Sequence, residues 1–134
     1  MEIHIKIVGV LLVALAVMHV GIPNYFKWKQ ELQPLTLITR QILYVHTFFI
    51  AFVVLLIGLL CLGYSHDLVS TSLGRIVCMG LAVFWLTRLI FQFFVYSSKV
   101  WKGKIFETIM HILFSLLWLY FSSVFVLACI YELR

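Results

Sequence analysis

The chain has 134 residues, of which 64% are hydrophobic and only 11% are charged. A soluble domain is about half apolar and a quarter charged, so this composition indicates an integral membrane protein and excludes an ordinary soluble one. The formal net charge of +5 should then govern membrane orientation and attract anionic lipid headgroups, and we expect no nucleic-acid partner.

Four apolar segments follow one another, and each is close to or above the ~20 residues that a membrane-spanning helix needs. They cover residues 5–22, 41–64, 76–96 and 105–131. The first resembles a signal peptide, but its apolar part is long and no small-residue cleavage site follows, so we interpret it as a retained span. Because backbone polar groups must be satisfied internally in lipid, all four should be helices. Short links predict a single all-α domain over residues 1–134, arranged as a four-transmembrane-helix up-down bundle.

The links between these segments have the composition of membrane interfaces. Residues 23–40 place Tyr25 and Trp28 among lysines, and residues 65–75 are rich in Ser and Thr, which offer N-caps for the third helix. The first and third links share one side of the membrane and hold six basic residues: Lys27, Lys29, Arg40, Lys99, Lys102 and Lys104. The opposite side holds three: Lys6, Arg75 and Arg134. This bias predicts a multi-pass protein of the cytoplasmic membrane with both termini outside.

Each predicted helix carries one polar side chain at a similar depth. These residues are His19, His46, Gln92 and His111, which lie three to six residues from the helix end on the basic side. Since successive helices alternate in direction, a rise of ~1.5 Å per residue places all four roughly 5–9 Å below one interface. Arg88 lies one turn deeper, on the same stripe of its helix as Gln92.

Three histidines from three helices predict a cofactor site. A transition metal could be held by His19, His46 and His111, with one coordination position left open for water or substrate. Alternatively, two of the three histidines could be the axial ligands of a haem. No carboxylate lies in the core of any predicted span, which argues against a di-iron carboxylate site. Two other interpretations stay open: a structural network that joins the helices, and part of a path for protons or small solutes.

A charged Arg88 at membrane depth needs a partner. Among the acidic residues only Glu107 lies on the same side as the polar layer and close enough to approach, and backbone carbonyls are the other internal choice. A partner from outside the chain could be a haem propionate, a lipid phosphate or a substrate carboxylate, each of which fits a guanidinium fork. A quinone carbonyl is a further option.

Several other residues are expected to have structural roles. Cys61, Cys78 and Cys129 fall near the opposite ends of their helices and should pack as small apolar side chains, with a soft-metal site or a disulfide as the alternative. Trp85 should pack in the core or wall a pocket above Arg88. Ser115, Trp118 and Ser122 continue roughly along the His111 face and should pack between helices.

The leading functional hypothesis is a haem- or metal-binding redox protein, either an electron-transfer module or a small membrane oxidoreductase. Its cofactor would lie among His19, His46, His111, Arg88 and Gln92. The alternative, from a different class, is a non-catalytic accessory or assembly subunit of a larger membrane complex, with the polar layer as a structural network. The expected partners are the lipid bilayer and either such a complex or further copies of the chain.

Overall fold

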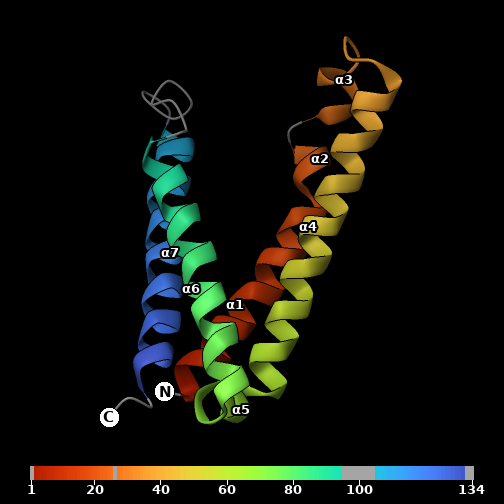
Figure 1. Ribbon diagram of the computed structural model, residues 1–134. Helices are drawn as coiled ribbons and strands as arrows, with labels where there is room; N and C mark the ends of the chain where they lie inside the picture. Colours follow the sequence, from red (N-terminus) through yellow and green to blue (C-terminus); the bar gives the residue numbers. More distant parts are fainter. Residues whose placement is uncertain (1, 26, 95–104, 132–134) are drawn as a thin grey trace. The chain divides into compact units, whose positions relative to one another are not determined.

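The computed structural model describes residues 2–25, 27–94 and 105–131, and within these ranges the regular structure is entirely helical (Figure 1). The helices are α1 (Glu2–Val20), α2 (Ile22–Tyr25), α3 (Trp28–Glu31), α4 (Leu37–Gly63), α5 (Ser65–Ser70), α6 (Ser72–Phe94) and α7 (Ile105–Tyr131). The all-α prediction is therefore confirmed for this part of the chain. Four helices are long and apolar enough to cross a membrane: α1, α4, α6 and the Thr108–Ile130 part of α7.

The boundaries of three spans differ from the predicted ones, since α1 covers Glu2–Val20 instead of residues 5–22 and both α4 and α6 start earlier than predicted. α4 and α6 begin at Leu37 and Ser72, four residues before the apolar segments at 41 and 76. The cause is N-capping, because the Thr36 hydroxyl accepts a 3.4 Å hydrogen bond from the backbone N–H three residues later. Thr71 does the same for α6 at 2.9 Å, which confirms the expected cap in the second link. These helices therefore start at a hydroxyl cap in the polar link.

Two of the links contain short helices. Residues 23–40 include the end of α2 and all of α3, and residues 65–75 include α5. α1 ends at Val20, and Pro23 lies in the first turn of α2, where its missing N–H is not needed. The third link, residues 97–104, lies outside the described residues.

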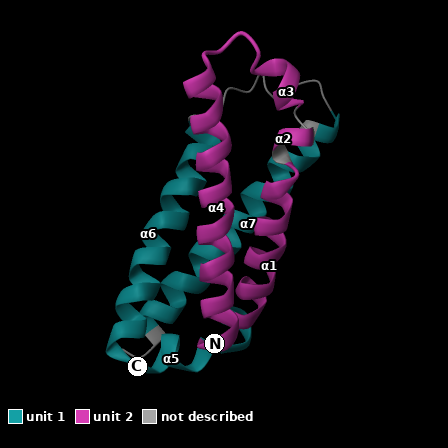
Figure 2. Ribbon diagram, turned by 90° about the vertical axis from the view of Figure 1, so that its right-hand side faces the viewer, with its two compact units in different colours: residues 1–5, 65–134 teal, residues 6–64 magenta. Residues whose placement is uncertain are grey.

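The chain divides into two compact units, which we call the N-terminal unit (residues 6–64) and the C-terminal unit (residues 1–5 and 65–134) (Figure 2). In the N-terminal unit, α1 and α4 approach closely through glycines. A Cβ added to Gly9 would lie 2.8 Å from Leu62 Cγ and 2.9 Å from the Gly58 carbonyl oxygen. A Cβ on Gly58 would lie 3.0 Å from the Gly9 carbonyl oxygen, so the absence of side chains at both positions permits this contact.

In the C-terminal unit, α6 and α7 run side by side (Figure 1) around an aromatic core. The Trp85 ring is 2% exposed and stacks on Trp118 with ring centroids 5.0 Å apart, and Phe121 meets Trp85 edge-on at the same distance. Trp85 thus packs in the core. Cys78 is a buried free thiol, as expected of a small apolar side chain, and its Sγ lies 3.6 Å from the Leu68 carbonyl oxygen.

Candidate functional site

The five residues of the predicted site are divided between the two units. His19 on α1 and His46 on α4 belong to the N-terminal unit, whereas Arg88 and Gln92 on α6 and His111 on α7 belong to the C-terminal unit. The two sets differ in their hydrogen bonds: His19 and His46 each contact a backbone carbonyl of their own helix, whereas Gln92 contacts His111 across two helices.

In the C-terminal unit, Gln92 joins α6 to α7. It is 7% exposed, and its Nε2 amide lies 3.0 Å from Nδ1 of His111. Its Oε1 accepts a 3.4 Å hydrogen bond from the indole N–H of Trp118, which lies seven residues after His111 on α7. Both ends of the buried amide are therefore used in contacts between the two helices. Gln92 and His111, two of the predicted site residues, are therefore in contact with each other.

These contacts assign the protonation of the His111 ring. Because Trp118 Nε1 can only donate, the Gln92 group facing it is the carbonyl oxygen, and the amide NH₂ faces His111. An amide NH₂ also only donates, so Nδ1 of His111 is the acceptor and a neutral ring carries its proton on Nε2. A histidine that binds a metal through Nε2 needs the opposite tautomer. This geometry suits a structural hydrogen bond better than a metal ligand.

The hydroxyls along the same interface are satisfied within α7. The Ser115 hydroxyl donates to the His111 carbonyl oxygen at 2.7 Å, and the Ser122 hydroxyl donates to the Trp118 carbonyl oxygen at 2.8 Å. Both serines and Trp118 are buried, which agrees with the expectation that they pack between helices. The seven-residue spacing places Trp118 on the His111 face, but nothing in that spacing shows that its indole reaches Gln92.

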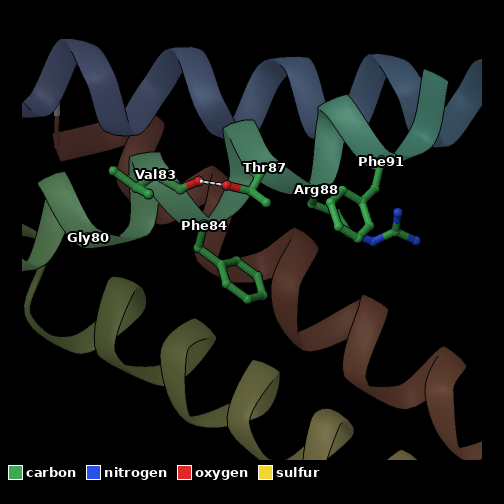
Figure 3. A pocket seen from close by; sticks show the side chains of 6 residues that line it. All are labelled: Gly80, Val83, Phe84, Thr87, Arg88 and Phe91. Atoms are coloured by element: carbon green, nitrogen blue, oxygen red, sulfur yellow. Dashed lines mark hydrogen bonds between the residues drawn. The ribbon is translucent and has the colours of Figure 1, made fainter. Parts of the chain in front are cut away.

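Arg88 contacts the same cluster from the side of α6. It is half-buried, and its guanidinium carbon lies 5.2 Å from the centre of the Trp118 ring, which is a cation–π contact. Arg88 also lines a groove along α6 together with Gly80, Val83, Phe84, Thr87 and Phe91 (Figure 3). The side chain of Glu107, its expected acidic partner, lies outside the described residues.

In the N-terminal unit both histidines bind their own helices in the same way. Nδ1 of His19 lies 2.8 Å from the Leu15 carbonyl oxygen, and Nδ1 of His46 lies 2.8 Å from the Ile42 carbonyl oxygen. A carbonyl can only accept, so Nδ1 carries the proton in both rings, and the neutral form has a bare lone pair on Nε2. Across the described ranges, no hydrogen bond reaches either Nε2 atom. This is the tautomer in which histidine binds metals through Nε2, with Nδ1–H oriented by a carbonyl.

The contact between the glycines gives the relative level of these two rings. His19 lies ten residues beyond Gly9 on α1, about 15 Å along the helix, and His46 lies twelve residues before Gly58 on α4, about 18 Å. The two rings are therefore within about one helical turn of the same level in the N-terminal unit. His19 is half-buried and His46 is exposed.

Among the residues that the structure describes, no group of three or more His, Cys, Asp or Glu side chains could hold a metal ion. Comparison with known proteins adds no functional assignment, because no family model, no curated protein and no solved structure matches the chain. The chemistry of the two polar sets is therefore the basis for the functional argument.

Proposed function

We propose that this protein is a membrane-embedded haem protein that transfers electrons, with His19 and His46 as the two axial ligands of the iron. The observation that carries the proposal is the hydrogen bond from each Nδ1–H to a backbone carbonyl, which leaves each Nε2 lone pair available. Two histidines complete the axial positions of a haem iron. A structural zinc site needs four protein ligands and a catalytic one needs three, so a pair of histidines suits haem better than zinc.

The charge at one end of the N-terminal unit supports an anionic cofactor. Lys27, Lys29 and Arg40 lie on the links and helix ends near the two histidines in sequence. Arg40 is half-buried, and its Nε atom is buried with no hydrogen-bond partner in the described part of the chain. It lies six residues before His46, about 9 Å along α4. We propose that Arg40 pairs with a haem propionate, because a guanidinium fork matches a carboxylate.

In this proposal the contacts of Gln92 with His111 and Trp118, which join α6 to α7, support the fold. Gln92 and His111 join the two helices, and the redox chemistry belongs to α1 and α4. We further propose that the four apolar helices form an up-down bundle in the cytoplasmic membrane. The six-to-three distribution of basic residues favours cytoplasmic first and third links and external termini.

The experiment is the visible spectrum of the full chain, purified in detergent after expression with ample haem, in its oxidised and reduced states. The wild-type protein should contain a six-coordinate low-spin haem. His19→Ala and His46→Ala should each lose the haem or convert it to a five-coordinate species, because each removes one axial bond. His111→Ala and His66→Ala are matched controls that should retain the wild-type spectrum.

A protein without haem would refute the proposal. If metal analysis of that protein also found no transition metal, the accessory-subunit hypothesis would replace it. One observation already favours that second hypothesis: the Gln92, His111 and Trp118 contacts are complete within the chain, as a structural network requires.

A further inference from the structure

Two histidine contacts hold the first turn of α1 on the C-terminal unit. Residues 1–5 belong to that unit, whereas the rest of the helix belongs to the N-terminal unit (Figure 2). On α5, Nδ1 of His66 lies 2.6 Å from the Glu2 carboxylate. The Tyr120 hydroxyl on α7 lies 3.2 Å from Nδ1 of His4. The start of α1 is therefore held by side chains from both α5 and α7.

The two contacts differ in how they respond to pH. A hydroxyl can both donate and accept, so Tyr120 can pair with His4 whether or not the histidine ring is protonated. A carboxylate forms a stronger hydrogen bond with a protonated ring than with a neutral one, so the Glu2 contact depends on the charge of His66. The side chains of His66 and Glu2 are 73% and 45% exposed, and this pair therefore equilibrates with the surrounding water.

The charged groups around His66 all favour its protonated form. Within the described residues these groups are Glu2 from α1 and Asp67 from α5 itself. α6 and α7 also pack against α5, and the described parts of both add no charged group at this ring. The hydrogen bond to Glu2 is the main reason that the pKa of His66 lies above its usual 6.5. The contact should therefore be complete below pH 6.5 and weaken as the pH rises through the raised pKa.

We propose that these contacts form a pH-sensitive latch at the start of α1, closed when His66 is protonated and weakened when it is neutral. An exposed ion pair contributes little to global stability, so the effect of the latch is local. The end of a helix opens at low cost, and its open population changes with the loss of a single contact. The latch goes beyond the proposed haem function and does not depend on it, because both contacts lie in the C-terminal unit.

The test is hydrogen exchange of the full chain in detergent micelles from about pH 5 to about pH 8.5, a range that spans the titration of histidine. Each rate is divided by the intrinsic exchange rate at that pH. The backbone amides of residues 6–8 report opening of the first turn, because their helical partners are the carbonyls of residues 2–4. As the pH rises, their opening should increase by ten raised to the difference between the pKa of His66 and 6.5. An NMR titration of the His66 ring in the same sample measures that pKa. The amides of residues 50–53 on α4 are the internal control and should show no such step.

Glu2→Gln and His66→Gln should each remove the step. Both variants are needed, because Glu2 has a further interaction in the chain that His66→Gln leaves in place. Tyr120→Phe is the matched control: it removes the second contact, so it should increase opening at every pH and keep the step. A step that persists in either of the first two variants would overturn the proposal, and so would its absence from the wild-type protein. Loss of the step in Tyr120→Phe would also overturn it, because the pH dependence would then lie at His4.

Discussion

Replacing Gln92 by Leu should separate the energy of the α6–α7 hydrogen bonds from that of the surrounding apolar packing. Gln92 is 7% exposed and makes two contacts across the interface, at 3.0 Å to His111 and at 3.4 Å to Trp118. Interhelical hydrogen bonds in membrane proteins contribute about 0.6 kcal/mol on average and at most about 1.7 kcal/mol. The 3.4 Å contact is long, so we expect a total loss of about 1–2 kcal/mol. Leu has a similar volume, so little of this loss should come from a cavity.

The assay is reversible unfolding in mixed micelles, combined with ¹⁵N NMR of the histidine rings. In the wild-type protein His111 should carry its proton on Nε2, whereas His19 and His46 should carry theirs on Nδ1. Without the Gln92 donor, His111 should shift toward the Nδ1–H form. Gln41→Leu, at an exposed position on α4, is the control and should change stability by less than about 0.5 kcal/mol. The reasoning fails if Gln92→Leu changes neither the stability nor the tautomer of His111.

Two further perturbations test contacts in each unit. Gly9→Ala should lower stability in thermal melts by about 1–3 kcal/mol, because its Cβ would lie 2.8 Å from Leu62 Cγ. Gly63→Ala, which meets nothing within 4 Å, should cause no loss; equal effects would contradict the glycine contact. A 2.6 Å hydrogen bond to Glu2 raises the pKa of His66 above its usual 6.5. The stabilisation from this contact should therefore be complete below pH 6.5 and disappear as the pH rises through the raised pKa. In Glu2→Gln an NMR titration should show the His66 pKa returning toward 6.5, and an unchanged value would exclude the contact.

The four spans could be predicted because the thickness of the bilayer sets a length that few other structures require. The predicted and observed helices overlap in every case, and α7 has the predicted bounds. The starts of α4 and α6 could not be located from hydropathy, because Thr36 and Thr71 cap them within polar links. A hydroxyl cap is a local hydrogen bond, and it does not change the apolar pattern from which a span is predicted.

One pair of the predicted site residues is in contact. Gln92 and His111 lie near facing ends of two helices that follow each other in the chain, and they meet at 3.0 Å. Depth does not determine which ring nitrogen meets which group, so the different tautomers of His46 and His111 could not be predicted. The partner of Trp118 was missed for the same reason: it depends on the direction of a side chain across an interface.

The lone pairs of the histidines are the basis of our proposal that His19 and His46 bind a cofactor whereas His111 supports the fold. A bare imidazole nitrogen inside a membrane span loses its hydrogen bond to water and gains nothing unless a donor or a metal replaces it. At His111, Gln92 supplies the donor to Nδ1, so that lone pair is satisfied within the chain. At His19 and His46 a backbone carbonyl accepts the hydrogen bond from Nδ1–H, and no hydrogen bond within the described part of the chain reaches Nε2. Two such rings within about one turn of a common level are costly unless an electrophile binds them both. An iron bound to both would remove that cost, and this is the basis on which we propose His19 and His46 as the ligand pair.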